Sequence, residues 1–240
     1  MNVSSGYAQA WERFWQDAPD GPGGAFWDVA PALAAQRHLA YFEAHFDPGL
    51  PVVDLGCGSG TQTRFLAGRY PRVLGVDLAH AAVARARRDD PRGLAGYQRL
   101  DAVDTDAVRA LHAEVGDANV YLRGILHLCE PGDRSRLVDG VATLTGQRGR
   151  AFAVEWAEAA GDVLRDLARG PDGPRPELAA VLAYGVAPGG LRDDAVPGYF
   201  TSAGLDVLAA GQERQHAAGL RPDGARTEVP SHWLVAGLAA

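Results

Sequence analysis

Short apolar runs alternate along the chain with longer stretches in which apolar residues recur at helical spacing. These runs lie at Val52–Leu55, Val73–Val76, Tyr97–Leu100 and Ala118–Leu122, with a fifth near residues 150–154. Most are short and largely apolar, as expected for strands buried on both faces. Strands that alternate with helices require a parallel sheet with right-handed crossovers. This part of the chain therefore predicts an α/β fold.

The region before the first strand predicts two helices. Amphipathic patterns cover residues 7–16 and roughly 31–46, and aromatic residues are frequent between them. We expect residues 1–48 to form an N-terminal helical lid that closes over a ligand and excludes water. Residues 49–240 then form the main domain, and the chain is a single domain overall.

The C-terminal region predicts a hairpin. Two strand candidates, Leu205–Gln215 and Thr227–Leu238, flank the sequence Arg-Pro-Asp-Gly at 221–224. Pro-Asp-Gly favours a tight turn, so these strands should pair antiparallel. The expected architecture is a doubly wound, mostly parallel seven-stranded sheet that ends in an antiparallel hairpin.

A glycine-rich turn follows the first strand. Asp54 ends the strand, and Gly56, Gly58 and Gly60 precede the helix that begins near Thr61. Glycine lets the backbone approach a ligand closely, and the amides of a helix N-terminus carry partial positive charge. The segment therefore predicts a nucleotide-type site at the carboxyl end of a parallel strand. A dinucleotide fingerprint would place its third glycine one residue later, so the spacing fits a pyrophosphate ligand poorly.

Acidic residues end the next two strands as well. Asp77 follows the second strand and Asp101 follows the third. One carboxylate can accept hydrogen bonds from both hydroxyls of a ribose. An acid about 20 residues beyond the glycines is also found in dinucleotide folds, so Asp77 alone does not decide between cofactors.

The pattern Asp-x-Gly-x-Gly-x-Gly at 54–60 resembles the first motif of class I S-adenosylmethionine-dependent methyltransferases. The resemblance covers roughly residues 26–156 with recognisable motifs and implies a Rossmann-like methyltransferase fold with S-adenosylmethionine as cofactor and S-adenosylhomocysteine as product. It implies that Asp54 helps to hold the amino group of the cofactor, that Asp77 binds the ribose and that Asp101 lies near the adenine amine. The cofactor residues that it implies are Asp54, Gly56, Cys57, Gly58, Gly60, Thr61, Asp77, Leu78, Asp101, Ala102 and Arg123.

One histidine stands where an acceptor would react. His127 follows the fourth strand in Tyr-Leu-Arg-Gly-Ile-Leu-His-Leu, a segment similar to the post-strand motif of many small-molecule methyltransferases. Imidazole can act as a general base near neutral pH, so we predict that His127 is catalytic; a packing role is the alternative. The residues predicted to line the acceptor pocket are Trp27, Glu155, Trp156 and Tyr199. No metal is expected, because this stretch offers Arg123, His127 and Glu130 in place of the acids and amide that grip a divalent ion in related enzymes.

Composition and charge argue against nucleic-acid and membrane partners. The net charge of −7 and the absence of a basic stretch argue against nucleic acid. All 23 basic residues are arginine, which suggests a GC-rich bacterial genome. The two cysteines, Cys57 and Cys129, show no metal or disulfide spacing, and no apolar run is long enough to span a bilayer, so we expect a cytoplasmic protein without a membrane partner.

The sequence thus predicts methyl transfer to oxygen or nitrogen of a small molecule, in bacterial secondary metabolism. Two alternatives keep the cofactor fold but change its use: an elimination or cyclisation, or a subunit that supports a partner enzyme. A nicotinamide-dependent oxidoreductase is a further alternative. The sequence is compatible with a homodimer or with a complex with another enzyme.

Overall fold

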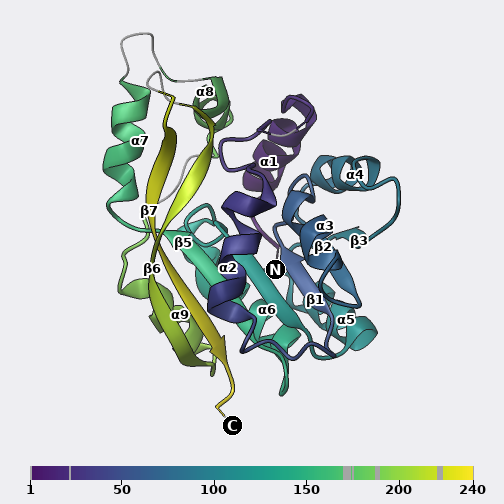
Figure 1. Ribbon diagram of the computed structural model, residues 1–240. Coiled ribbons are helices and arrows are strands. Elements are labelled where there is room, and N and C mark those ends of the chain that lie inside the picture. Colours follow the sequence, from purple (N-terminus) through teal and green to yellow (C-terminus); the bar gives the residue numbers. More distant parts are fainter. Residues whose placement is uncertain are drawn as a thin grey trace.

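The computed structural model describes residues 2–21, 23–169, 174, 176–186, 190–220 and 224–239. Within this part of the chain a single seven-stranded sheet has the order β3-β2-β1-β4-β5-β7-β6 (Figure 1). The strands are β1 Val52–Leu55, β2 Val73–Asp77, β3 Gly96–Arg99, β4 Asn119–Arg123, β5 Ala151–Trp156, β6 Asp206–Leu220 and β7 Arg226–Gly237. Strands β1 to β5 pair in parallel, whereas β7 pairs antiparallel with both β5 and β6. The predicted fold class, including the antiparallel hairpin, is confirmed.

Helices cover both faces of the sheet (Figure 1). They are α1 Ser5–Asp17, α2 Ala35–Phe42, α3 Thr61–Ala67, α4 His80–Arg88, α5 Thr105–Val115, α6 Arg134–Thr145, α7 Ala160–Ala168, α8 Pro176–Ala183 and α9 Ala195–Ser202, with short 3-10 turns at Pro31–Leu33 and Pro131–Asp133. Helices α2, α3 and α4 pack near β1 to β3, and α5, α6 and α9 pack together on a second layer. Among the described residues, every helix is too short or too polar to cross a membrane.

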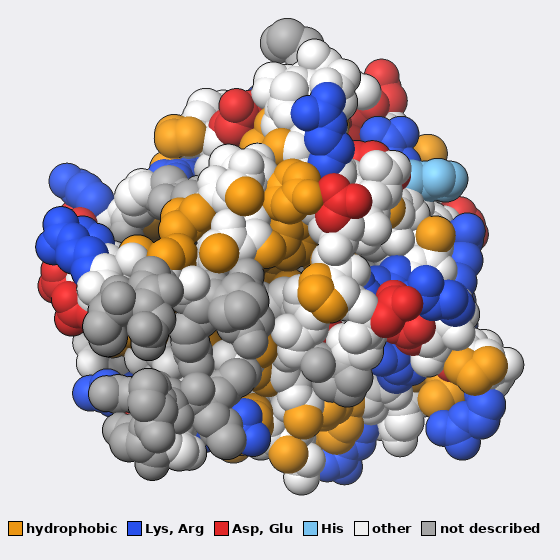
Figure 2. All heavy atoms as spheres, turned by 90° about the horizontal axis from the view of Figure 1, so that it is seen from above, with side chains coloured by type: hydrophobic (Ala, Val, Ile, Leu, Met, Phe, Trp, Pro, Cys, Tyr) orange, Lys and Arg blue, Asp and Glu red, His pale blue; other side chains and the backbone are white. Residues whose placement is uncertain are grey.

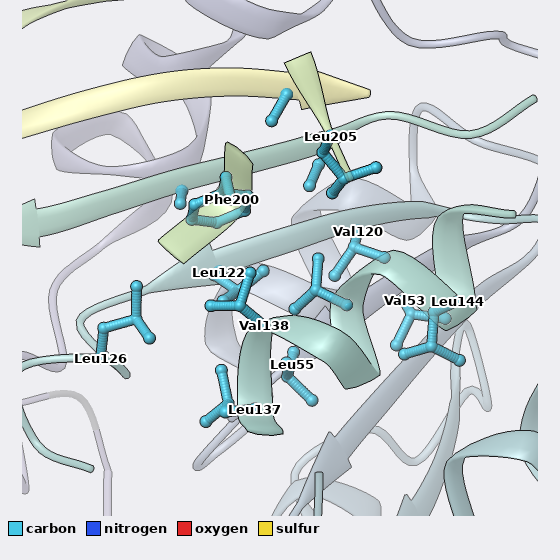
Figure 3. Close-up of a cluster of buried hydrophobic side chains, with 14 of the residues drawn as sticks. Val53, Leu55, Val120, Leu122, Leu126, Leu137, Val138, Leu144, Phe200 and Leu205 are labelled. Carbon is cyan, nitrogen blue, oxygen red and sulfur yellow. The ribbon is translucent and has the colours of Figure 1, made fainter. Parts of the chain in front are cut away.

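Side chains alternate between the two faces of each strand, because successive Cβ atoms of a strand point to opposite sides. In β1, Val53 and Leu55 join the core under α5, α6 and α9, whereas Val52 joins the core under α2 and α3. Figure 3 shows the first of these cores, where Leu137 and Val138 of α6 lie beside the side chains of β1 and β4. The same alternation turns Asp54 toward α3, where it meets Thr63.

The helix expected over residues 31–46 is interrupted. A 3-10 turn covers Pro31–Leu33, and α2 begins only at Ala35 because Ala34 has a non-helical backbone (φ −140°, ψ −103°). The side-chain amide oxygen of Gln62 in α3 accepts the Ala35 N–H at 3.2 Å. This tertiary contact gives the Ala35 amide a hydrogen-bond acceptor, which it lacks within its own helix because α2 begins there. The predicted turn at 221–224 lies largely outside the described residues.

Two helical glycines give a paired stability prediction. A Cβ added at Gly140 in α6 would lie 2.5 Å from the carbonyl oxygen of Ala102, whereas a Cβ at Gly198 in α9 would meet nothing within 4 Å. We expect Gly140→Ala to lower the free energy of unfolding by about 1 kcal/mol through overpacking, and Gly198→Ala to raise it by about 0.5–1 kcal/mol through helix propensity. Urea denaturation measures both. Equal shifts in the two variants would contradict the packing of α6 on the loop after β3.

Candidate functional site

A cavity lies where the strand order changes direction, at the carboxyl ends of the strands around β1. Such a switch point is the usual ligand site of an open α/β sheet. The cavity has a volume of about 1190 Å³, including the part open to solvent, and its walls come from β1 to β4 and from the N-terminal segment. Figure 2 views the molecule from the end where α1 lies; hydrophobic side chains gather near the centre of this face and most charged side chains lie toward its rim.

The glycine turn after β1 has little room for side chains. Gly56 and Gly58 have φ of +74° and +52°, a conformation that favours glycine. A Cβ at Gly56 would lie 2.1 Å from the side chain of Ile125, and one at Gly58 would lie 2.7 Å from the indole of Trp15. The turn is therefore a backbone surface at the cavity floor, bounded by an aliphatic and an aromatic side chain.

Two buried carboxylates stand beside this turn. Asp77 accepts the N–H of Gly58 at 3.0 Å with one oxygen and the N–H of Ala79 at 2.9 Å with the other. Asp54 accepts a 2.6 Å hydrogen bond from the hydroxyl of Thr63. Both carboxylates thus brace the turn and still line the cavity.

Burial raises the pKa of both Asp54 and Asp77 to about 6. Because the folded-state pKa lies above the ordinary value of 3.8, each carboxyl stabilises the free protein below about pH 4. This contribution is lost as the pH rises through about 6. Near neutral pH the free site therefore holds two carboxylates that a positively charged ligand would stabilise.

The N-terminal segment contributes contacts of its own. Asp101 accepts the N–H of Val3 at 3.0 Å, and Tyr7 donates its hydroxyl proton to the carbonyl of Leu128 at 2.9 Å. Arg123, at the end of β4, donates to the carbonyl of Trp27 at 2.9 Å. Residues before β1 are therefore bonded directly to strand ends on two sides of the cavity.

His127 lies in the cavity wall and is held from behind. Its Nδ1 is 2.6 Å from a carboxylate oxygen of Glu155, and its ring stacks on the indole of Trp156 with centroids 4.4 Å apart and planes at 16°. Both His127 and Glu155 are almost fully buried. The arrangement can present an imidazole nitrogen to a bound molecule.

Most residues singled out from the sequence lie together in the wall of this cavity. Those that line it are Trp27, Asp54, Gly56, Cys57, Gly58, Thr61, Asp77, Leu78, Asp101, Ala102, Arg123, His127 and Trp156.

Three of the predicted residues are not among those that line it. Gly60 is the N-cap of α3, behind the turn. Glu155 lies on the same side of β5 as Ala153, beneath the loop after β4, whereas Trp156 points to the other side and reaches the cavity. Tyr199 lies in α9, half-buried against the core shared with α6.

The structure also adds cavity residues that were not among the individual residues predicted for the site. They are Val3, Tyr7, Trp11, Trp15, Asp28 and Gln215, among others. The many aromatic residues before β1 were the sequence feature that could have indicated Trp11 and Trp15 as cavity residues. No local sequence pattern indicated Asp28. Its carboxylate accepts a 3.1 Å hydrogen bond from the hydroxyl of Ser59, which lies 31 positions further along the chain.

Comparisons with known proteins point to one family. A family model described as a methyltransferase domain matches residues 52–149. A carboxy-S-adenosyl-L-methionine synthase of Chromohalobacter salexigens is 33% identical over 111 residues, which are 45% of this chain and 37% of that protein. The match therefore spans little more than a third of this curated relative.

Solved structures agree over the whole chain. A S-adenosylmethionine-dependent methyltransferase from Anabaena variabilis is 28% identical with a TM-score of 0.90, covering 100% of this chain and 98% of that one. Another similar structure is of a protein of echinomycin biosynthesis, connected with the conversion of a disulfide bond into a thioacetal group. Its TM-score is 0.68 at 20% identity, and the match covers 95% of this chain and 91% of that one. The magnesium protoporphyrin IX methyltransferase of Synechocystis has a TM-score of 0.60 at 17% identity, covering 98% and 95%. The last two likenesses concern the fold alone.

Proposed function

We propose that the chain is a class I S-adenosylmethionine-dependent methyltransferase that transfers a methyl group to an oxygen or nitrogen atom of a small molecule. The observation that carries this proposal is one cavity that joins the glycine turn, the Asp77 carboxylate and the His127 imidazole. We place the reaction in bacterial secondary metabolism and in the cytoplasm, as the composition favours.

The residues present fit S-adenosylmethionine. Its sulfonium and ammonium groups are positive, and four acidic side chains line the cavity: Asp28, Asp54, Asp77 and Asp101. Its carboxylate is negative, and Arg123 is the one basic side chain among the described cavity residues apart from histidine. Each oxygen of Asp77 accepts one backbone bond. A carboxylate has about four acceptor positions, which leaves capacity for two ribose hydroxyls.

The protein's own contribution is alignment and the handling of a proton. When bound, the cofactor supplies a methyl group that is displaced in line from its sulfonium. The indoles of Trp11, Trp27 and Trp156 form apolar walls that position an acceptor and exclude water. His127 stands in the same wall, where an imidazole can accept the proton that an acceptor atom loses.

Calorimetry and product analysis test this function. We expect the purified protein to bind S-adenosylmethionine, and to form S-adenosylhomocysteine when an extract of the organism that encodes it supplies the acceptor. Absence of binding would overturn the proposal. Binding with no S-adenosylhomocysteine in any extract would remove methyl transfer but keep the cofactor site.

A second candidate is a reaction that modifies S-adenosylmethionine or uses it without methyl transfer. The matching curated relative is named as a synthase of carboxy-S-adenosyl-L-methionine, which favours this alternative. Mass spectrometry of the cofactor after incubation separates the two: a heavier sulfonium product would support the alternative, and S-adenosylhomocysteine with a methylated acceptor would support the proposed function.

The raised pKa values predict pH-dependent binding. Asp54 must ionise to meet the ammonium group, and Asp77 must ionise to accept from both ribose hydroxyls. Affinity for S-adenosylmethionine should therefore increase from about pH 5 to 7, by up to about tenfold per pH unit for each carboxyl below its pKa. Calorimetry across this range measures the slope. Asp77→Asn removes one of the two groups and should flatten the profile. Affinity that increases on acidification would contradict the assignment.

A further inference from the structure

Glu155 collects an unusual number of hydrogen bonds from one loop. One carboxylate oxygen accepts the N–H groups of Ile125 and Leu126, each at 3.0 Å, and the other accepts the N–H of His127 at 3.1 Å. The second oxygen also lies 2.6 Å from the Nδ1 atom of His127. The Glu155 side chain is 1% exposed, so its carboxylate is surrounded by these protein groups and not by solvent. One side chain of β5 thus sets the backbone path of the loop after β4.

The short contact decides the protonation of the imidazole. Both oxygens already accept backbone N–H bonds, and a carboxylate can only accept. At 2.6 Å, Nδ1 must therefore carry a proton and donate it to Glu155. The amide N–H of Trp156 also points at this nitrogen from 3.4 Å, but that contact is 0.8 Å longer and much weaker than the one to Glu155. In a neutral imidazole the remaining nitrogen, Nε2, then has a free lone pair.

The ring has little freedom to turn away. It stacks on Trp156 at 4.4 Å, and an added Cβ at Gly124 would lie 3.2 Å from its Cε1 atom. The loop is held from the other side as well, because Arg134 donates to the carbonyl of Leu126 at 3.0 Å and Tyr7 donates to the carbonyl of Leu128 at 2.9 Å. His127 lines the cavity, whereas Glu155 does not. No described residue bonds to Nε2, which is therefore free to meet a bound molecule.

We propose that Glu155 is a positioning residue that holds His127 as an Nε2 base, and that the acceptor is a molecule with a hydroxyl group that must lose its proton. This inference rests on the proposed function. A hydroxyl nucleophile gains from a general base, whereas an unprotonated amine often needs none. The bond from the acceptor oxygen to the methyl carbon forms as the carbon–sulfur bond breaks, and the electron pair of that bond goes to sulfur. The hydroxyl proton goes to Nε2, and the Glu155 carboxylate stabilises the resulting imidazolium. The indole walls favour a flat, largely apolar body for this acceptor.

Nitrogen-15 NMR of protein labelled in its histidines tests the positioning role without an acceptor. We expect the His127 signals, identified by their loss in His127→Gln, to show a protonated Nδ1 and an unprotonated Nε2 at slightly alkaline pH. Glu155→Gln should abolish this tautomer preference. A protonated Nε2 in the wild-type protein, or the same tautomer in Glu155→Gln, would overturn the assignment.

The chain offers a matched control in a second buried pair. His38 Nε2 lies 2.9 Å from Glu213, and both side chains are at most 3% exposed, but neither lines the cavity. Glu213→Gln should change the signals of His38 and leave those of His127 unchanged. A general loss of folding would disturb both histidines in both variants, and the control separates that outcome from a specific role of Glu155.

The acceptor class is tested with S-adenosylmethionine labelled with carbon-13 in its methyl group. After incubation with cell extract, the chemical shift of the transferred carbon distinguishes an O-methyl from an N-methyl or C-methyl product. We expect an O-methyl product, with transfer at least about tenfold slower in Glu155→Gln. An N-methyl or C-methyl product would overturn the hydroxyl inference and keep the methyltransferase function. Binding of the cofactor without any transfer of label would instead overturn the proposed function itself.

Discussion

Replacing His127 with alanine is expected to lower the rate of methyl transfer by about 10²–10⁴-fold, the range that general bases contribute, with cofactor affinity close to that of the wild type. The physical reason is that the imidazole lies in the cavity wall while its Nδ1 is held by Glu155. Truncation removes the group that accepts a proton but leaves the glycine turn and Asp77 in place. The loss should therefore appear in turnover and not in binding.

The measurement combines the rate of S-adenosylhomocysteine formation with calorimetric affinity for S-adenosylmethionine. His112→Ala is a suitable control, because His112 lies in α5, pairs with Asp117 at 2.9 Å and does not line the cavity. If His127→Ala lost affinity and turnover in equal proportion, or if the control lost as much activity, His127 would be a packing residue.

The second large effect concerns Asp77. We expect Asp77→Ala to weaken binding of S-adenosylmethionine by about 1–3 kcal/mol, as when buried hydrogen-bonding groups lose their partner. Two causes add in this variant. The ribose hydroxyls would lose their acceptor, and the N–H groups of Gly58 and Ala79 would lose theirs, which loosens the turn.

Two further variants separate these causes. Asp77→Asn keeps one carbonyl oxygen and should recover part of the affinity. Asp104→Ala removes a carboxylate that accepts the N–H groups of Asp106 and Ala107 at the start of α5, outside the cavity. This control should lower stability by about 1 kcal/mol, as the loss of a helix cap does, without a change in calorimetric affinity. Unchanged affinity in Asp77→Ala would show that the ribose lies elsewhere.

Much of the fold could be predicted because its signals are local. The run Val52–Leu55 is both the predicted and the observed first strand. The second strand likewise follows from its short apolar run and ends at Asp77, whereas the fourth is shifted by one residue, from the predicted Ala118–Leu122 to Asn119–Arg123. The prediction of one helix over residues 31–46 was wrong, because the non-helical backbone of Ala34 separates a 3-10 turn from α2, which then ends at Phe42.

The site shows the same division. Placing Glu155 beside the acceptor followed from its position at a strand end. The alternation of β5 places it behind the cavity wall instead, and the neighbouring Trp156 lines the cavity. Glu155 and Trp156 were both predicted at the pocket, but adjacent residues of a strand point to opposite faces, so only one of them can line it.

By itself the sequence determined the α/β class, the glycine turn and the row of acidic strand ends, because strand period and turn chemistry depend on neighbours a few residues apart. Only the tertiary structure decided that Glu155 orients His127, that Val3 bonds to Asp101 and that Asp28 enters the cavity. These pairs are separated by 28, 98 or, for Asp28 and its partner Ser59, 31 positions. Their contact depends on strand register and on the packing of whole elements, which local patterns do not encode.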